Sequence, residues 1–438
     1  MLDLQRIREN PDAVKQASIN KKNPVDIDGL IKLDADRREI IKRVEELKGL
    51  RNKKSPEIAL LKKAKKDAEA AALMEEMKGV SEKIKELDAE QNSVEEKIKG
   101  IMVWVPNPAH ESVPHGNGAE DNVVASVHGS PKTFDFPAKD HLQLGAALDI
   151  IDFSRGAKVS GAGFPVYKGH GALLERALIN FMLDTHVRQN GYCEIFPPFL
   201  VNAESLFGTG QLPKSRDQMY YIGEDDLFCI PTAEVPVTNL HRDEVLDASQ
   251  LPVKYCAYSA CFRREAGSYG KDTKGFLRVH QFNKVELVKI TAPETSYDEL
   301  EKLRADAEGI LMALNLHYRV LCLCDADLSF AAAKCYDLEA WAPAEKKFLE
   351  VSSCSCFEDF QARRMNIRFR PKPGEKPKFV HTLNGSGLAT ARILVAILET
   401  YQTKEGTVRI PDVLKPYMHG MEEIGPRPKS GSLGSSIA

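Results

Sequence analysis

The sequence has little net charge and no long hydrophobic run, and each shortage excludes a class of protein. Its 438 residues carry a formal net charge of -3, so any contact with a polyanion must come from a local basic patch. The longest apolar runs, such as ILVAIL at 393–398, are far too short to span a bilayer. The opening MLDLQRIREN has no apolar segment of the kind a secretory signal needs. We therefore expect a soluble, cytoplasmic chain that makes no membrane contact.

Cysteine is also scarce. The nine cysteines are an odd number and are scattered along the chain, which is unlike a disulfide framework and favours a reducing compartment. The pairs Cys322/Cys324 and Cys354/Cys356 would place both thiols on one face of a strand. No second pair at metal spacing accompanies either one, so we interpret them as buried reduced thiols and expect no zinc.

The clearest positive signal is a heptad pattern over residues 30–101. With 43% hydrophobic and 28% charged residues, the chain can bury a substantial core in two or three domains. Apolar residues four and three apart predict a long helix, with Gln91 as the only polar member: Leu73, Met77, Val80, Ile84, Leu87, Gln91, Val94, Ile98 and Ile101. An earlier seam continues less regularly to Ile58 and Leu61: Leu30, Leu33, Arg37, Ile40, Val44 and Leu47. Two such helices can cover each other's apolar stripes only by folding back, which predicts an antiparallel hairpin with its turn near residues 63–70.

Two features lie near the end of this hairpin. Pro56 falls inside the first helix, which should kink there or restart with Ser55 as N-cap and Pro56 at the first position. Six lysines lie around it: Lys53, Lys54, Lys62, Lys63, Lys65 and Lys66. Such a run suits a solvated helix face, and it equally suits contact with nucleic-acid phosphates.

Composition divides the rest of the chain. The Pro/Gly/Asn-rich stretch that begins at residue 103 predicts a linker over 103–130, which separates an N-terminal domain, 1–102, from a larger one, 131–425. The Pro/Gly/Ser-rich tail, 426–438, is expected to be disordered. Strand-like segments, among them VPVTNL at 235–240 and KYCAYSACF at 254–262, alternate irregularly with helical ones such as 295–315 and 386–402. This order predicts an α+β domain on a mostly antiparallel sheet.

The segment CFRREAGSYGKDTKGFLRVHQFNKVELV, residues 261–288, predicts a β-hairpin that carries chemistry. Arg263 and Glu265 would share one strand face, and the second strand would return Phe282 and Glu286. Arginine can hold a phosphate or carboxylate through two parallel hydrogen bonds, and phenylalanine offers a surface on which a base can stack. The alternative is an Arg263–Glu265 salt bridge beside a core Phe282.

Other segments add polar groups. IPTAEVPVTNL would present Thr232 and Glu234 on one face if extended. EVSS at 350–353 offers only oxygen ligands, suited to Mg²⁺ held together with nucleotide phosphates.

The segment TLNGSGLATAR, residues 382–392, predicts a strand, a turn through Gly385 and Gly387, and a helix with Arg392 in its first turns. Such a helix start favours anions.

Taken together and in this order, these segments resemble the seryl-tRNA synthetases of the common bacterial type, which are class II aminoacyl-tRNA synthetases. GYCEIFPPFLV is similar to motif 1 with Pro198 as its proline, FRRE through KVELV to motif 2, and GSGLATARILVAILE to motif 3 with Arg392. The likeness covers residues 1–420. It implies an antiparallel catalytic domain that dimerises through the motif 1 region, and a helical arm that binds the long variable arm of a tRNA. It also implies ATP and Mg²⁺, formation of seryl-adenylate from L-serine, and transfer of serine to tRNA, with selenocysteine tRNA as a further candidate acceptor.

The resemblance also implies roles for individual residues. Catalysis would depend on Arg263, at the α-phosphate and the serine carboxylate, and on Arg392, on the far phosphate side. Serine would contact Thr232, Ala233, Glu234, Arg263, Glu286 and Ser386. ATP would contact Arg263, Arg264, Glu265, Val279, Phe282, Glu350, Val351, Ser352, Ser353 and Arg392, with Glu350 and Ser353 holding Mg²⁺.

The chain departs from the family pattern in three places. Lys271 and Lys274 stand where arginine is usual in the motif 2 loop, Cys356 and Phe357 replace a pattern such as Asn-Cys, and VPNPAH replaces a more usual linker. The lysines keep charge but lose bidentate geometry, which affects contacts to the tRNA acceptor end.

Two alternative functions remain open at this point. A related enzyme could activate an amino acid for a carrier protein, but such a protein would not need a long basic arm. A coiled-coil interaction protein with a decayed catalytic domain should have lost its Arg, Glu and Ser positions, and all are present.

Overall fold

The computed structural model describes residues 1–266 and 275–426, which form two compact units, Met1–Pro106 and the remainder from Asn107. The loop lysines Lys271 and Lys274, and the tail beyond residue 426, lie outside the described residues. Within the described part, no helix combines the length and the apolar character that crossing a membrane requires.

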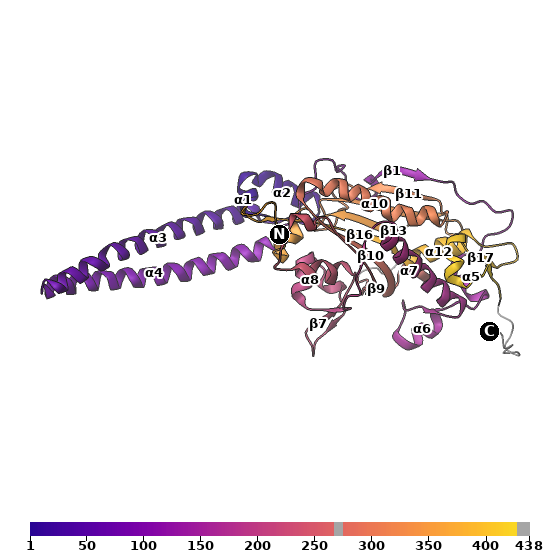
Figure 1. Ribbon diagram of the computed structural model, residues 1–438, viewed down its shortest axis with the longest axis horizontal. Helices are drawn as coiled ribbons and strands as arrows, with labels where there is room; N and C mark the ends of the chain where they lie inside the picture. The colour runs from indigo at the N-terminus through magenta and orange to yellow at the C-terminus, as the bar shows by residue number, and fades with distance from the viewer. Residues whose placement is uncertain (267–274, 427–438) are drawn as a thin grey trace. The chain divides into compact units, whose positions relative to one another are not determined.

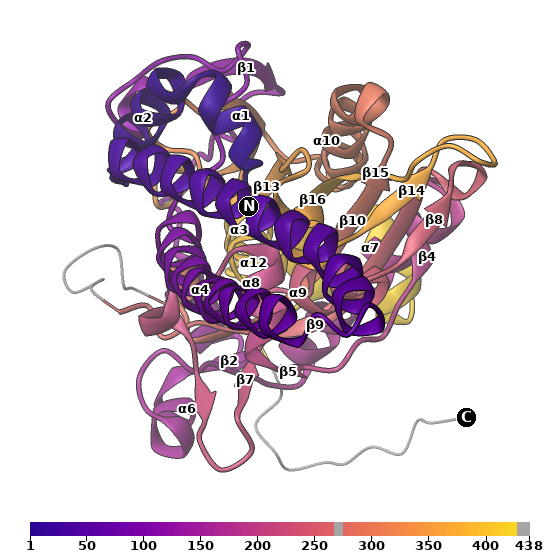
Figure 2. The same ribbon diagram turned by 90° about the vertical axis from the view of Figure 1, so that its left-hand side faces the viewer.

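The first unit is helical and is dominated by two long helices (Figure 1). Its elements are α1 (Leu4–Glu9), α2 (Pro11–Asn20), α3 (Ile27–Lys63) and α4 (Asp67–Met102). α3 and α4 lie side by side, also when viewed from the tip (Figure 2), and only residues 64–66 separate them. Lys48 of α3 pairs with Asp88 of α4 at 3.6 Å. The predicted antiparallel hairpin and the position of its turn are confirmed.

The heptad seams form the hairpin's core, but unevenly. In α3 the buried apolar residues end at Val44, whereas Leu60, nearer the tip, is 67% exposed. In α4 the buried residues spread along the helix: Ala70, Met77, Ile84, Leu87, Val94, Ile98 and Met102. Because α3 buries no apolar side chain beyond Val44, the tip is the more solvated part of the hairpin.

Pro56 does not interrupt α3, which runs unbroken from Ile27 to Lys63. The predicted restart is wrong. The Ser55 hydroxyl donates to the Arg51 carbonyl at 2.8 Å, a bond typical of serine inside a helix, not of an N-cap. Since Asn52, whose carbonyl loses its partner at Pro56, is solvent-exposed, water can satisfy that carbonyl.

The second unit is built on one large sheet, in the order β1-β11-β12-β13-β16-β10-β9-β4. Neighbouring strands are antiparallel except β4 and β9. Its strands are β1 (Val123–His128), β4 (Cys193–Glu194), β9 (Val253–Phe262), β10 (Gln281–Thr291), β11 (Tyr318–Cys322), β12 (Lys334–Ala342), β13 (Lys347–Cys356) and β16 (His381–Ala389). The predicted α+β class on a mostly antiparallel sheet is confirmed.

Smaller strands and the helices complete this unit. The strands are β2 (Ile151–Asp152), β3 (Val166–Tyr167), β5 (Leu200–Val201), β6 (Tyr221–Ile222), β7 (Leu227–Cys229), β8 (Val245–Asp247), β14 (Arg368–Arg370), β15 (Lys378–Phe379), β17 (Val408–Arg409) and β18 (Glu423–Ile424). The helices are α5 (His141–Ala147), α6 (Phe153–Ser160), α7 (His170–Arg188), α8 (Ala203–Thr209), α9 (Glu234–Thr238), α10 (Ser296–Ala313), α11 (Phe360–Met365) and α12 (Thr390–Thr400).

The main core lies between the large sheet and three amphipathic helices, α7, α10 and α12. It takes in Cys354 and Cys356, both fully buried on one face of β13. All nine cysteines are free thiols. In the CxC pairs Cys324, Cys354 and Cys356 are buried, as expected, whereas Cys322 is half-buried.

Three local predictions need correction. The boundary between the two units falls inside the expected linker, 103–130, after Pro106. The rest of that stretch belongs to the second unit, because it contains β1, which pairs with β11, and Asn107 is fully buried with bonds to the Ala331 and Phe357 carbonyls. VPVTNL forms the short helix α9 followed by a 3-10 turn, because its buried apolar residues pack on neighbouring elements and override their β-propensity.

The third error concerns the glycines of TLNGSG. Gly385 and Gly387 lie within β16, not in a turn. A Cβ at Gly387 would stand 2.6 Å from the His186 ring, and one at Gly385 would stand 2.9 Å from the Cys354 sulfur. These glycines therefore allow close packing of the sheet on its core.

Candidate active site

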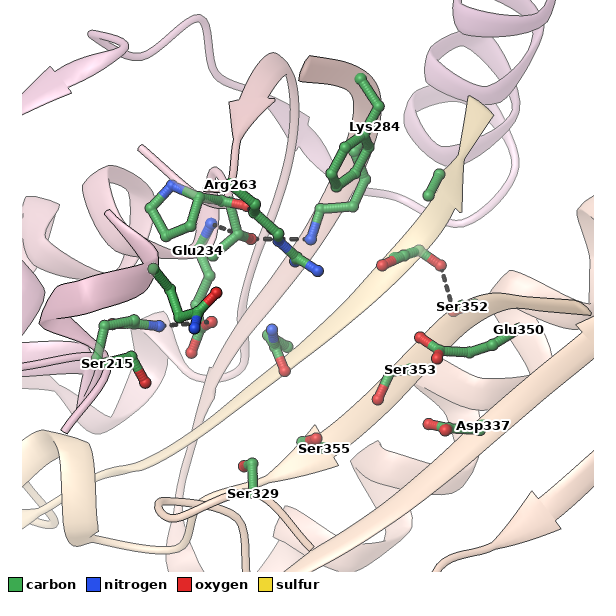
Figure 3. A pocket seen from close by; sticks show the side chains of 18 of the residues that line it. Ser215, Glu234, Arg263, Lys284, Ser329, Asp337, Glu350, Ser352, Ser353 and Ser355 are labelled. Atoms are coloured by element: carbon green, nitrogen blue, oxygen red, sulfur yellow. Dashed lines mark hydrogen bonds between the residues drawn. The ribbon is translucent and has the colours of Figure 1, made fainter. Parts of the chain in front are cut away.

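A cavity of about 720 Å³ lies on the sheet face opposite the main core. Its strand residues alternate with core residues: Asp337 of β12 lines it, whereas Tyr336 and Leu338 belong to the core. Because successive side chains of a strand point to opposite faces, this alternation shows that the cavity and the core lie on opposite faces of the sheet. Polar side chains from distant parts of the sequence point into it (Figure 3).

Arg263 reaches the cavity from the end of β9. Its backbone N–H donates to the His280 carbonyl at 2.9 Å, and its Nε donates to the Pro231 carbonyl at 3.4 Å. The guanidinium lies 5.2 Å from the centre of the Phe282 ring. Arg263 is thus held half-buried, with donors left over for a ligand (Figure 3).

The predicted shared strand face of Arg263 and Glu265 is wrong. β9 ends at Phe262, and Glu265 has φ 50°, a left-handed conformation that turns the chain. The Glu265 carboxylate pairs with Arg278. The alternative interpretation of Phe282 as a core residue holds only in part, because this half-buried ring packs against a buried apolar cluster and also lines the cavity.

One end of the cavity carries buried charges of both signs. Lys284 of β10 donates from Nζ to the Thr232 hydroxyl at 2.8 Å and forms an ion pair with Glu286. Glu286 is fully buried and accepts a bond from Asn384 Nδ2 at 2.9 Å. Glu234, at the start of α9, is 5% exposed and lines the same end. This set can receive both an ammonium and a hydroxyl group of a small ligand.

The environment of Glu234 shifts its carboxyl group towards the neutral form relative to an ordinary glutamate. Burial, and then the charge of Glu286, raise the pKa of Glu234 to about 7. A hydrogen bond from Gln361 and the charges of Lys284 and Arg263 act in the opposite direction. A cationic group in the cavity would therefore draw Glu234 towards its ionised form.

The other end of the cavity gathers carboxylates around an arginine. Glu350 and Ser353 lie on β13, and Asp337 of β12 is the direct register partner of Ser353 (Figure 3). Arg392 donates from Nη1 to the Glu350 carbonyl at 3.0 Å and to its carboxylate at 3.3 Å. Burial, and then the charge of Glu350, raise the pKa of Asp337 above its usual range. Such crowded acidic groups are suited to a divalent cation.

Part of the cavity wall is apolar. Phe276, Leu277, Val279 and Val351 line it and are almost fully buried. The flat ring of Phe282 borders this region. The wall can accept an aromatic base beside the two charged ends.

Most of the residues implied by the resemblance do line one cavity. They are Thr232, Glu234, Arg263, Glu265, Val279, Phe282, Glu350, Val351, Ser352, Ser353, Ser386 and Arg392. Ala233, Arg264 and Glu286 are not among the lining residues. Glu286 and Ala233 are fully buried behind it, and Arg264 is exposed, with its guanidinium 6.0 Å from the Tyr220 ring centre.

Sequence reasoning missed several lining residues. Lys284 could have been found, because it lies between Phe282 and Glu286 in the same strand alternation. Asp337 and Asn384 carry no local signal, since only the pairing of β12, β13 and β16 brings them to the cavity. The departure at Phe357 also lies in the cavity wall, where this residue is 4% exposed.

A second group of titratable side chains lies behind the cavity. In the described part of the chain, His141, Glu345 and Glu399 are the group of His, Cys, Asp and Glu residues close enough to hold a metal ion. His141 Nε2 accepts from the Phe276 N–H at 3.4 Å, and Nδ1 lies 3.3 Å from Glu399 Oε1. This arrangement assigns the proton to Nδ1, so the ring serves as a buried hydrogen-bonded support for the Phe276 backbone.

Family profiles match both units. Residues 1–109 match the seryl-tRNA synthetase N-terminal domain, and residues 220–401 match the class II tRNA synthetase core domain (G, H, P, S and T).

Full-length relatives agree with the profiles. A serine–tRNA ligase of Chloroherpeton thalassium is 59% identical over 433 residues, which is 97% of this chain and 100% of that protein. The crystal structure of seryl-tRNA synthetase from Pyrococcus horikoshii complexed with ATP superposes with a TM-score of 0.93 at 39% identity, covering 98% of this chain and 100% of that one. The cytoplasmic serine–tRNA ligase of Naegleria fowleri in complex with AMP gives 0.88 at 29% identity, covering 98% and 99%.

Proposed function

Because this chain belongs to the seryl-tRNA synthetase family, we propose that it is the ATP-dependent ligase that charges tRNA with serine. The observation that carries the proposal is that Thr232, Glu234 and Lys284 line the same cavity as Arg263, Phe282 and Glu350. Thr232, Glu234 and Lys284 suit a small amino acid, and Arg263 beside them suits the α-phosphate that the amino acid attacks. Phe282 suits the base, and Glu350 suits a metal ion held with the other phosphates.

The first step joins a serine carboxylate oxygen to the α-phosphorus of ATP and releases pyrophosphate. Negative charge develops on the phosphoryl oxygens, and the spare donors of Arg263 would face it. The reaction needs alignment of two bound substrates and no protein nucleophile. In the second step a 3′-terminal hydroxyl of tRNA attacks the seryl carbonyl carbon, and AMP leaves.

Serine selection would rest on two buried carboxylates. Glu234 lines the cavity and can accept hydrogen bonds from serine, whereas Glu286 lies behind the wall and would act through Lys284 and Asn384, which it binds. Alanine would leave a buried acceptor unpaired, at a cost of about 1–3 kcal/mol. Threonine must be excluded by the size of the pocket, which is a weaker filter.

Mg²⁺ would be held by Glu350 and Ser353, with Asp337 beside them. The donor set fits, because it consists of oxygens and because a cation would relieve the repulsion between Asp337 and Glu350. Bound there with ATP, the ion would offset the charge of the phosphates.

The hairpin tip would bind tRNA. Four lysines there are exposed: Lys62, Lys63, Lys65 and Lys66. Of these, Lys66 forms an ion pair with Glu69, and the nearby Lys54 forms one with Glu57. The lysines without such an ion pair are the best placed to contact phosphates.

A homodimer would form through the motif 1 region. Apolar side chains there are exposed, with Phe196 at 76% and Leu200 at 43%, and a second copy could cover them. We place the enzyme in the cytoplasm.

The alternatives make different predictions for one assay. A carrier-protein ligase would form the adenylate but charge no tRNA, and a non-catalytic protein would do neither.

The decisive experiment is serine-dependent exchange of labelled pyrophosphate into ATP, with alanine and threonine in parallel. Exchange with serine is expected, and charging of serine tRNA and of selenocysteine tRNA is then measured separately. Absence of exchange from folded protein with Mg²⁺ would overturn the proposal.

Arg263→Ala tests the site. Removing its donors should lower kcat/KM for exchange by at least about 100-fold, while the exposed Arg188→Ala on α7 serves as the matched control. Circular dichroism checks that both variants fold. Near-normal exchange by folded Arg263→Ala would refute its assignment.

A further inference from the structure

Gln361 lies directly behind the charged end of the cavity and is not one of its lining residues. It belongs to α11 and is 1% exposed. Its Nε2 donates to Glu234 Oε1 at 2.7 Å and to the Thr209 carbonyl at 3.0 Å. Its Oε1 accepts from the Thr382 hydroxyl at 2.7 Å. One side-chain amide therefore ties together α8, α9 and β16.

The chemistry of this position requires an amide in one orientation. Both partners of Nε2 are acceptors, and the partner of Oε1 is a hydroxyl donor. A flipped amide, or a glutamate, would place an oxygen against the Thr209 carbonyl and the Glu234 carboxylate. A hydrocarbon side chain would leave Glu234 Oε1 buried without this donor.

The bond from Gln361 has two consequences for Glu234. It occupies Oε1, so that Oε2 is the oxygen left for a ligand, with Gln211 Nε2 3.5 Å away. It also lowers the pKa of Glu234, against burial and the charge of Glu286 on β10. Lys284, also on β10, and Arg263, at the end of β9, act in the same direction as Gln361.

We propose that Gln361 is a positioning residue for the amino-acid half of the site, which holds the Glu234 carboxylate aimed at the ammonium group of the incoming amino acid. The proposal rests on the proposed function, since serine is the ligand that Glu234 would receive. It extends the site beyond the residues that line the cavity.

The test is Gln361→Met, which keeps the length of the side chain and removes both donors. In pyrophosphate exchange the KM for serine should rise by about 10-fold to 100-fold, while the KM for ATP stays within about 2-fold. Glu234 also loses a donor that favours its ionised form, so its pKa should be higher in the variant. The increase of kcat/KM for serine with pH should therefore occur at a higher pH than in the wild type. A merely structural role would change both KM values together and leave the pH profile in place.

Two further variants act as controls. Thr382→Val removes the bond to Gln361 Oε1 without touching Glu234, so the KM for serine should rise less than in Gln361→Met. The exchanged pair Glu234→Gln with Gln361→Glu restores a donor–acceptor bond between the two positions with the roles reversed. It should not recover the binding of serine, because the carboxylate no longer faces the cavity, and the Thr209 carbonyl still lacks its donor.

The outcomes separate this inference from the proposed function. If the wild type exchanges with serine and folded Gln361→Met keeps the same KM for serine and the same pH profile, the positioning role is overturned while the ligase activity stands. If the wild type shows no exchange with serine, the proposed function fails, and the role of Gln361 towards serine fails with it.

Discussion

The two units use charged residues in opposite ways. In the helical hairpin, the pair Lys48–Asp88 is 46% exposed on both sides. At the cavity wall and behind it, the side chains of Lys284 and Glu286 are 6% and 0% exposed. Exposed pairs contribute little to stability and leave charge available to a polyanion. A buried pair cannot lose one partner without leaving an uncompensated charge, so its two side chains are held in place. Side chains held in this way can fix the position of a small ligand.

The largest expected effect tests this contrast in stability directly. Lys284→Met should lower the free energy of unfolding by about 3–5 kcal/mol, because Glu286 is left buried and unpaired. Lys48→Met should cost about 0–1 kcal/mol. Urea denaturation followed by circular dichroism measures the free energy of unfolding of both variants. Equal losses in the two variants would contradict the difference between the buried and the exposed pair.

A smaller effect is expected at the hairpin tip. Replacement of its lysines by alanine should lower kcat/KM for tRNA charging by about 10-fold and flatten its dependence on salt, since fewer counterions are released. Pyrophosphate exchange should not change. The replaced residues are Lys62, Lys63, Lys65 and Lys66, and the control replaces four exposed lysines of the second unit, Lys372, Lys376, Lys378 and Lys404. Unchanged charging would assign the tip lysines to a solvated face.

The smallest effect concerns pH and sharpens the comparison. Salt should change the binding of tRNA by the hairpin, whereas pH should change the binding of serine in the cavity. The pKa of Glu234 is raised from 4.5 to about 7, so its carboxyl group loses its proton as pH rises through 7. An ammonium binds the carboxylate form, and the KM for serine should therefore fall several-fold between about pH 6 and pH 8. Without serine the sign is reversed: a raised carboxyl pKa makes the folded state less stable as pH rises from 4.5 to 7. A KM for serine that is flat with pH would contradict the assignment.

Local patterns predicted the hairpin better than the site. The spacing of Met77, Ile84 and Leu87 was sufficient to place α4 and its buried face, because residues three and four apart in the sequence lie on the same face of a helix. The same kind of argument was wrong for VPVTNL, whose tertiary packing makes it α9. It was also wrong for Gly387, whose missing side chain is explained by His186, far away in the sequence.

The candidate site illustrates the same limit at the level of single residues. Arg263, Phe282 and Glu286 were predicted because they lie on one continuous segment of the sequence. Asp337 and Gln361 were missed because their partners, Ser353 and Glu234, are remote in sequence. No periodicity connects such pairs.

The sequence by itself determined the fold class, the long helical hairpin and a set of the side chains that line the cavity, because these depend on short-range periodicity and on motifs of neighbouring residues. The tertiary structure alone decided which charges are buried together, that Lys284 neutralises Glu286, and that Gln361 supports Glu234. The physical reason is that burial and pairing depend on strand order and helix packing, and these bring together residues that no local rule links.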